Sequence, residues 1–417
     1  MDGCNQSYST FMPSEIFCNW TQDALLCWPA TKANTTVEQP CPKMKGSDTT
    51  KIVRKYCGEN GEWDSRANIT NWTNYTGCFT KEILLLLERI QNMSPNEFER
   101  RIDVAKIVRI LEVVGLTASS IILVLSISIY YLFGNLKNDR TLIHKNLFMA
   151  ALGAVLMKLL ICIDQILTGY GNILPTNSGV DGTPFLCEVS YILLEYCKSS
   201  TYMWMFIEAS HLYNAVAVTA TPLSFKKSYL LLGWFLSAVF VVVWVTIMIS
   251  KPQSHCWYAY NYNPLYWILE GPRIFALVVN TIYLINIVKV VVVKVRNNHT
   301  QTNEVEKIKK TLKATLVLLP LLGITNYLSH IEPQLDCPLW YFELYTFMSY
   351  FLNSFQGMLI GLLYCLLNQE VKETVLNRIR VRYSSASSEL PQVSVNIRKN
   401  DCNEQVVETI ENLILKF

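Results

Sequence analysis

The chain has little charge: 17% of its 417 residues are Asp, Glu, Lys or Arg, whereas 51% are hydrophobic. Its mean hydropathy of +0.22 is high for a soluble protein. The net charge of +3 is too small to indicate nucleic-acid binding. The first ten residues also lack the apolar run of a secretory signal peptide. The composition favours a membrane protein, in which either a segment upstream or the first membrane helix directs insertion.

Catalytic and metal-binding motifs are absent as well. The sequence contains no H-E-x-x-H, G-x-S-x-G or phosphate-binding loop. His144 and His211 could ligate a metal, but no third ligand stands at a matching spacing. We therefore expect no enzyme, metal or cofactor. A transporter would show Gly- or Pro-broken helices at paired positions of two halves, and the apolar segments show no such pairing.

The first 78 residues are rich in cysteine and in N-x-S/T sequons, a combination that indicates an oxidising, extracellular setting. A domain of this size buries little core and needs disulfides, and six cysteines allow fifteen pairings. The six cysteines are Cys4, Cys18, Cys27, Cys41, Cys57 and Cys78. The expected glycosylation sites are Asn5, Asn19, Asn34, Asn68, Asn71 and Asn74.

Seven apolar segments follow, each long enough to span a bilayer. They cover residues 104–134, 141–167, 185–219, 228–250, 264–295, 311–330 and 338–367. The predicted organisation is a cysteine-rich domain (1–78), a stalk (79–103), a seven-helix bundle (104–367), an amphipathic helix on the inner membrane surface (368–383) and a disordered tail (384–417).

Loop charge predicts the orientation of the bundle. The loops after the first, third and fifth segments are rich in Lys and Arg, whereas the opposite loops carry only Lys251. Basic loops stay in the cytoplasm, so the N-terminus is expected outside the cell and the C-terminus inside.

The third segment carries several ionisable groups, which at membrane depth usually face a bundle interior or a watery cavity. Glu195 and Lys198, three residues apart, either neutralise each other or face a ligand cavity open to the outside. Lys158 and Arg273 lie in the outer halves of the second and fifth segments and are expected to line the same cavity, where their charge suits an acidic or carbonyl-rich peptide N-terminus. Cys187 is expected to form a disulfide with Cys256; two free cysteines are the alternative.

Four polar side chains lie near the cytoplasmic ends of separate segments: His144, Glu208, Thr315 and Tyr364. They are either satisfied one by one or joined in a single hydrogen-bonded network. Such a network would hold the helices closed and break when one of them swings out.

Taken together, these residues resemble the secretin-like (class B) G-protein-coupled peptide-hormone receptors, from about residue 4 to residue 380. The resemblance in the N-terminal domain rests on Asp23, Cys27-Trp28-Pro29, Pro42, Gly61 and Trp63. In the membrane block it rests on RTLIHKNLF (140–148), Trp204 with Glu208, Gly233-Trp234, Cys256-Trp257, Asn280, KATLVLLPLLG (313–323), FQG (355–357) and YCLLNQEV (364–371).

The resemblance implies an all-α bundle of seven membrane helices with a small, disulfide-rich α/β ectodomain that contains two small antiparallel sheets. It implies the disulfides Cys4–Cys27, Cys18–Cys57 and Cys41–Cys78. The C-terminal half of a peptide would bind the ectodomain, and the peptide N-terminus would enter the bundle. The implied peptide contacts are Asp23, Trp28, Trp72 and Tyr75 in the ectodomain and Trp257 in the bundle. The implied bend in helix six involves Pro320 and Gly323, and the implied G-protein contacts are Arg140, Lys294, Asn368 and Glu370.

Within the family the chain is most similar to the calcitonin and calcitonin-gene-related-peptide receptors, through CNWTQDALLCW (18–28), NWTNYTGC (71–78) and LVLLPLLGI (316–324). Corticotropin-releasing-factor-like and invertebrate neuropeptide receptors share much of this pattern and remain alternatives. The expected function is that of a plasma-membrane peptide receptor that raises cyclic AMP through a stimulatory G protein. Arrestin, a single-span receptor activity-modifying protein and membrane lipid are further expected partners. An adhesion-type receptor is excluded, because residues 79–103 leave no room for its autoproteolytic domain.

Overall fold

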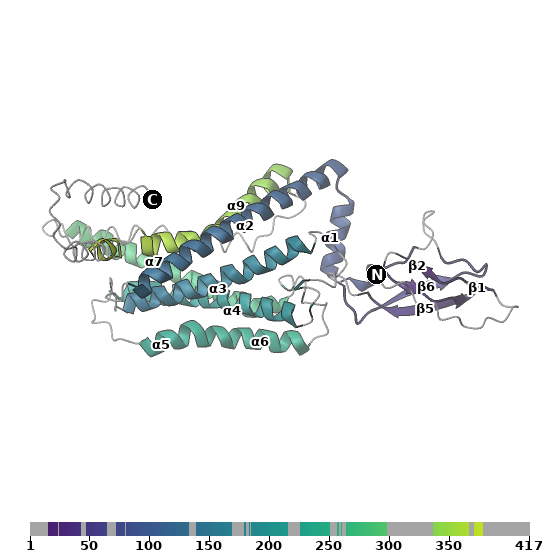
Figure 1. Ribbon diagram of the computed structural model, residues 1–417, viewed down its shortest axis with the longest axis horizontal. Coiled ribbons are helices and arrows are strands. Elements are labelled where there is room, and N and C mark those ends of the chain that lie inside the picture. Colours follow the sequence, from purple (N-terminus) through teal and green to yellow (C-terminus); the bar gives the residue numbers. More distant parts are fainter. Residues whose placement is uncertain are drawn as a thin grey trace, which may run out of the picture. The chain divides into compact units, whose positions relative to one another are not determined.

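The computed structural model describes residues 16–23, 25–42, 47–64, 72–79, 81–132, 139–168, 179–180, 183, 185–215, 226–250, 257, 260, 264–297, 337–366 and 371–377. Figure 1 shows these parts in colour along the sequence. The ectodomain and the helical bundle are described separately below.

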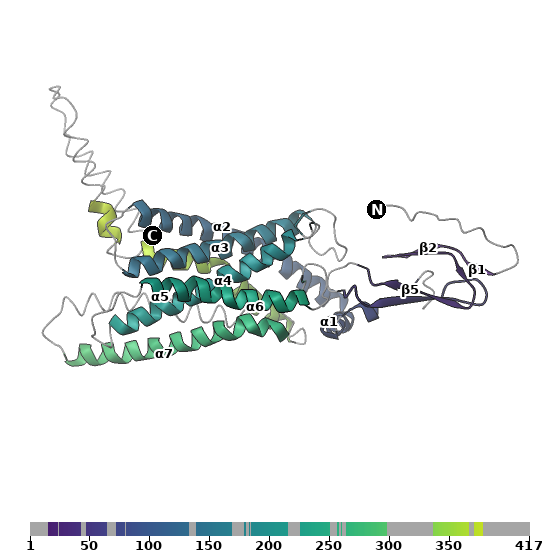
Figure 2. The same ribbon diagram turned by 90° about the horizontal axis from the view of Figure 1, so that it is seen from below.

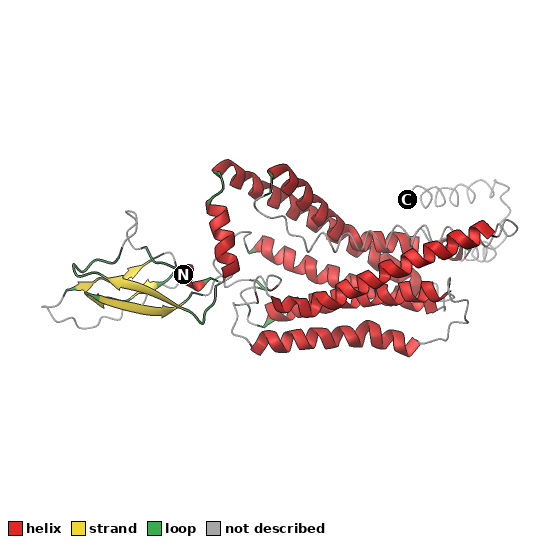
Figure 3. Ribbon diagram, turned by 180° about the vertical axis from the view of Figure 1, so that it is seen from behind, coloured by secondary structure: helices red, strands yellow, loops and turns green. Residues whose placement is uncertain are grey.

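The ectodomain is built from short antiparallel strands (Figure 3). The strands are β1 (Phe17–Cys18), β2 (Thr21–Gln22), β3 (Cys27–Trp28), β4 (Thr31–Lys32), β5 (Thr35–Pro40) and β6 (Ile52–Cys57). The β1–β4 and β2–β3 pairs keep one register and form a single hairpin that is interrupted opposite Pro29, a residue with no amide hydrogen to donate. With the β5–β6 hairpin, this gives the two small sheets that the family resemblance implied.

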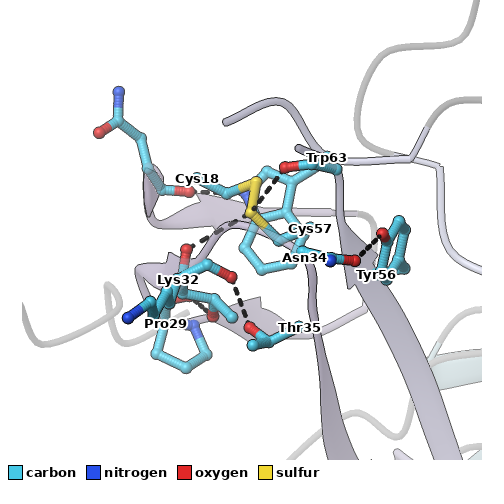
Figure 4. The surroundings of a disulfide bond; sticks show 11 residues. Cys18, Pro29, Lys32, Asn34, Thr35, Tyr56, Cys57 and Trp63 are labelled. Atoms are coloured by element: carbon cyan, nitrogen blue, oxygen red, sulfur yellow. Dashed lines mark hydrogen bonds between the residues drawn. A yellow bond between two sulfur atoms is a disulfide. The ribbon is translucent and has the colours of Figure 1, made fainter. Parts of the chain in front are cut away.

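Two disulfides close the ectodomain, Cys18–Cys57 and Cys41–Cys78, and both agree with the pairing that the resemblance implied. The first lies beside Trp63, whose indole donates to the Asn19 carbonyl over 2.6 Å, and near the Tyr56–Asn34 hydrogen bond (Figure 4). Cys27 is also disulfide-bonded, and Cys4, its expected partner, lies outside the described residues.

Helices form the rest of the described chain. They are η1 (Thr76–Cys78), α1 (Lys81–Gln91), α2 (Pro95–Leu132), α3 (Asp139–Leu167), α4 (Leu186–Tyr213), α5 (Lys226–Leu230), η3 (Leu231–Leu236), α6 (Ser237–Ser250), η6 (Pro264–Tyr266), α7 (Trp267–Asn297), α9 (Leu339–Gly361) and η7 (Leu362–Leu366). Six of the seven expected apolar segments are thus helical, and the segment 311–330 lies outside the described residues. Residues 371–377, within the expected amphipathic segment, are also helical.

Among the described residues, four helical stretches are long and apolar enough to cross a membrane: Pro95–Leu132, Asp139–Leu167, Lys227–Ser250 and Pro264–Val290. Helix α4 is comparably long but carries the charges that the sequence placed in it. Helix α2 begins nine residues before the apolar segment, because Ser94 accepts a hydrogen bond from the Glu97 amide and caps a charged first turn.

The bundle packs α2 between α3 and α9, α3 against α4, and α4 against α6 and α7 (Figures 1 and 2). The α2–α9 seam is lined by small residues. A β-carbon on Gly115 would lie 2.5 Å from the Ser354 side chain, so these two helices approach each other closely. The Ser119 hydroxyl donates to the Ser354 carbonyl over 2.7 Å and accepts from the Met358 amide over 3.0 Å, which satisfies polar groups inside the seam.

Candidate functional site

The carboxylate of Asp23 accepts hydrogen bonds from several parts of the ectodomain. It accepts hydrogen bonds from the Leu25 and Leu26 amides over 2.9 and 2.8 Å, and from the Trp28 indole over 2.8 Å. The hydroxyls of Thr73 and Tyr75 donate to it over 2.5 and 2.7 Å. One side chain therefore joins the first hairpin to the segment that precedes Cys78.

Burial alone would raise the pKa of the Asp23 carboxyl, but the hydrogen bonds from Thr73, from the backbone and from Trp28 outweigh it and lower the pKa below its usual value. Burial and the neighbouring carboxylate raise the pKa of Tyr75, so its phenol remains a donor. Lys55 is 3% exposed and its ammonium lies over the rings of Trp28 and Trp63, 5.7 and 5.4 Å from their centroids. Burial lowers the pKa of Lys55, and Asp23 opposes that shift.

The expected peptide contacts of the ectodomain differ in exposure. Trp28 is 1% exposed and forms the core with Val53 and the Cys41–Cys78 disulfide. Trp72 and Tyr75 are half-buried. Any contribution of Trp28 to peptide binding must therefore act through the shape of the domain, whereas Asp23, Trp72 and Tyr75 keep surface for a direct contact. The Asn74 side chain, at an expected glycosylation site, is exposed and accepts hydrogen bonds from the Thr76 amide and hydroxyl.

A buried ion cluster joins α4 to α7. Arg273, 2% exposed, donates to Glu195 over 2.7 Å, to Glu270 over 2.7 Å and to the Ser199 hydroxyl over 2.7 Å. Glu195 is fully enclosed and also accepts from Lys198 over 3.0 Å. The two sequence interpretations of Glu195 and Lys198 are thus compatible, because Lys198 pairs with Glu195 yet leaves 35% of its own side chain exposed. Tyr260 adds a hydroxyl bond of 2.7 Å to Glu195.

A second cluster joins α2 to α3. Glu112, 1% exposed, lies 2.8 Å from the Lys158 ammonium through one oxygen and 2.8 Å from Arg109 through the other. Arg109 reaches on to Gln165 over 2.7 Å. The Lys158 side chain is 31% exposed. Lys158 and Lys198 are therefore alike: each ammonium pairs with an enclosed glutamate, and about a third of each side chain remains exposed.

Three of the four expected network residues are described, and all three lie together. His144 Nε2 lies 2.9 Å from Glu208 Oε1, and the His144 and Tyr364 rings lie 4.7 Å apart. Tyr130 joins this group: its hydroxyl lies 3.3 Å from His144 Nδ1 and donates to the Tyr364 carbonyl over 3.0 Å. The Tyr130 hydroxyl therefore links His144 Nδ1 to the Tyr364 backbone, while His144 Nε2 contacts Glu208. Thr315 lies outside the described residues.

Some of the remaining expected residues are described by the structure, and the others lie outside the described residues. Trp257 is buried and packs edge-on against Trp244 at 5.4 Å, within a cluster that includes Leu269. Arg140 lies in the first turn of α3, Lys294 lies in α7, Asn19 and Asn34 lie in the ectodomain, and Cys187 is disulfide-bonded. Outside the described residues lie Cys256, Pro320, Gly323, Asn368, Glu370, Asn5, Asn68 and Asn71.

Sequence reasoning missed Glu112, Glu270 and Tyr130. Glu112 and Glu270 were available as carboxylates within apolar segments, the same signal that drew attention to Glu195. Tyr130 gave no such signal, because a tyrosine in a membrane helix is common and its partners lie on other helices.

Two family models match this chain. The model described as seven-transmembrane receptor (secretin family) matches residues 105–360, and the hormone receptor domain matches residues 15–81. The chain belongs to the secretin family of seven-transmembrane receptors. This confirms the resemblance and the fold class, and it places the chain among receptors rather than enzymes.

Similar members of the secretin family include the PDF receptor of Drosophila melanogaster, 39% identical over 388 residues, which cover 90% of this chain and 57% of that receptor. Calcitonin receptor-like protein 1 of Caenorhabditis elegans is 35% identical, with 89% of this chain and 69% of that protein covered. The human calcitonin receptor is 31% identical, with 86% and 70% covered. The chain thus spans just over half of the PDF receptor's length.

Proposed function

We propose that this protein is a plasma-membrane receptor for a C-terminally amidated peptide of the PDF or calcitonin type, and that it raises cyclic AMP through a stimulatory G protein. The observation that carries the proposal is the presence, in one chain, of a hormone receptor domain and a secretin-family bundle. The named relatives include a PDF receptor and calcitonin receptors, and both types match most of this chain.

The site geometry supports a peptide that reaches both parts of the chain. Trp72 and Tyr75 offer half-buried aromatic surface in the ectodomain. Lys158 and Lys198 offer two partly exposed cationic side chains in the bundle. A peptide with an acidic residue near its N-terminus and an amidated C-terminus satisfies both. The extracellular N-terminus, supported by loop charge, puts both groups on the ligand side.

The buried His144–Glu208 pair supports the signalling half of the proposal. It joins α3 to α4 in a region of low exposure, so a displacement of either helix would separate the two side chains and leave a buried polar group unpaired. Arrestin and a single-span modifying protein are further proposed partners, of the kind that act on an activated or assembled receptor.

The test is a ligand screen in transfected cells. Amidated neuropeptides, including Drosophila PDF and calcitonin, are applied to cells that carry the full chain, and cyclic AMP is measured. A response to one class at lower concentration than the others, absent from cells with empty vector, supports the proposal. Cells co-transfected with a single-span modifying protein test whether that partner is required. A surface-expressed receptor that binds a peptide but raises calcium and not cyclic AMP would replace the stimulatory G protein with another type.

A further inference from the structure

An open groove of 560 Å³ lies between α4 and the continuous helix formed by α5, η3 and α6. Its lining is apolar apart from one cation. The lining residues are Tyr196, Lys227, Leu230, Leu231, Trp234, Phe235 and Ala238. Leu231 and Phe235 are 58% and 61% exposed, so the groove presents apolar surface to whatever surrounds the bundle.

The floor of this groove is held in place by the bundle. The Trp234 indole donates to the Asn146 side chain of α3 over 2.9 Å, and its ring lies 6.0 Å from Tyr196. Gly233 precedes Trp234, and a β-carbon at Gly233 would lie 2.4 Å from the Trp204 indole. The η3 turn therefore packs closely against α4. Trp234 therefore cannot turn away, and the groove exists before any ligand arrives.

The groove is about as long as one lipid leaflet is thick, and like a leaflet it is polar at one end and apolar along the rest. From Lys227 to Ala238 the helix rises about 16 Å, and one leaflet contributes about half of a hydrocarbon core of about 30 Å. Lys227 lies at one end, and the remaining lining is aliphatic or aromatic. The sequence of residues 226–250 contains no Asp or Glu, so the helix itself offers this lysine no carboxylate.

We propose that the groove binds an anionic phospholipid, with its headgroup on the Lys227 ammonium and an acyl chain along Leu231 and Phe235 toward Tyr196. A zwitterionic lipid such as phosphatidylcholine also has a phosphate, but it carries its own cation beside that phosphate and matches the Lys227 charge less well than a lipid with net negative charge. A second copy of the chain fits less well, because a two-fold contact would oppose this face to itself and bring together two cations and no carboxylate. In the proposed orientation Lys227 lies at the cytoplasmic surface, where anionic lipids concentrate. The inference does not depend on which peptide the receptor binds.

The test uses the full chain in nanodiscs that hold one receptor each, made from phosphatidylcholine with added phosphatidylserine. Native mass spectrometry counts the lipids that remain bound. We expect preferential retention of phosphatidylserine, reduced about fivefold in Lys227→Gln, since one lysine near the surface contributes about that much. Lys145→Gln is the matched control, because the Lys145 ammonium lies over the Tyr131 ring at 4.6 Å and away from the groove lining. Phe235→Ala should weaken retention of either lipid.

Equal retention of both lipids by the unchanged chain, or equal loss in Lys227→Gln and Lys145→Gln, would overturn the proposal. Thermal unfolding of Lys227→Gln in pure phosphatidylcholine discs should match the unchanged chain, which shows that the variant folds. In discs large enough for two receptors, efficient crosslinking of Leu231→Cys between chains would identify the groove as an interface between copies and would also reject the lipid.

Discussion

At the scale of single residues, the Asp23 carboxylate concentrates more hydrogen bonds than any other side chain described here in the ectodomain. Asp23→Asn keeps the shape but replaces one acceptor oxygen with a donor group that faces other donors. We expect the ectodomain to lose about 2–3 kcal/mol of stability, since bonds to a charged group are worth more than neutral ones. Hydrogen exchange of the Trp28 and Val53 amides in the purified full chain measures this loss.

Asp48→Asn is the matched control, because Asp48 accepts its hydrogen bonds from Thr50 in an exposed turn. A surface substitution of this kind should change stability by less than about 0.5 kcal/mol. Equal protection of the core amides in Asp23→Asn and Asp48→Asn would show that the Asp23 hydrogen bonds contribute nothing net.

The lowered pKa of Asp23 also predicts a pH dependence of stability. A carboxyl whose pKa falls on folding stabilises the fold above its unfolded pKa of about 3.9, and that contribution disappears as the pH falls through the folded value. The stability difference between the unchanged chain and Asp23→Asn should therefore be constant from about pH 7 to pH 5 and shrink below about pH 4. Hydrogen exchange of the two proteins measured from about pH 7 to below about pH 4 tests this prediction. A stability difference between the unchanged chain and Asp23→Asn that grows on acidification would contradict it.

Trp72 is the residue expected to hold the C-terminal end of the peptide. Aromatic anchors of this kind usually cost about 2 kcal/mol or more when truncated, which is about thirtyfold in affinity. Trp72→Ala should weaken binding of the active peptide by that factor at matched surface expression. Trp20→Ala, which removes an indole that is 48% exposed in the same domain, should leave affinity unchanged. A Trp72→Ala receptor that binds within about twofold of the unchanged one contradicts the assignment.

At the scale of elements, Lys198 and Arg273 in the α4–α7 ion cluster have different surroundings, although the sequence assigned both to the same peptide cavity. Lys198→Gln removes a partly exposed ammonium, so peptide potency should fall while surface expression holds. Arg273→Gln removes the guanidinium that pairs with both enclosed glutamates and leaves Glu195 with Lys198 alone, a loss of about 3–5 kcal/mol, so surface expression should fall with potency. Dose–response curves and surface labelling in the same cells compare the two. Normal expression of Arg273→Gln would show that the cluster does not brace the fold.

The sequence predicted the helices well and their facing surfaces less well. Apolar length located α2, α3, α4, α6, α7 and α9, because a membrane span needs a fixed number of residues. It could not show that Arg273 turns inward onto Glu195, because which face of one helix meets another depends on all the helices at once. For the same reason the sequence did not identify Tyr130, whose partners lie on other helices. The disulfides came from family resemblance, since spacing alone allowed fifteen pairings.

At the scale of the whole molecule, the network around Glu208 is expected to hold the receptor inactive. His144→Arg should disrupt the 2.9 Å contact with Glu208 and the 3.3 Å contact with the Tyr130 hydroxyl. Each unpaired buried group costs about 1–3 kcal/mol, enough to shift a two-state equilibrium about tenfold. We expect raised ligand-free cyclic AMP at matched surface expression.

His211 complicates this test, because it lies one helical turn from Glu208 and could take over the carboxylate. The double substitution His144→Arg with His211→Ala removes that compensation. His211→Ala alone serves as the control and should leave basal cyclic AMP near that of the unchanged receptor. A double variant no more active than the unchanged receptor would leave the four polar residues without a shared role.

The close seam between α2 and α9 restricts how this bundle can move. A β-carbon on Gly357 would meet Leu123 at 2.9 Å and Ser119 at 3.0 Å, and one hydroxyl bonds two backbone groups across the same contact. A screw motion of either helix would carry bulkier residues into places now occupied by glycine and would break both bonds. Rearrangement therefore costs least where it leaves the seam intact. We therefore expect these two helices to keep their relative positions while other helices of the bundle are displaced.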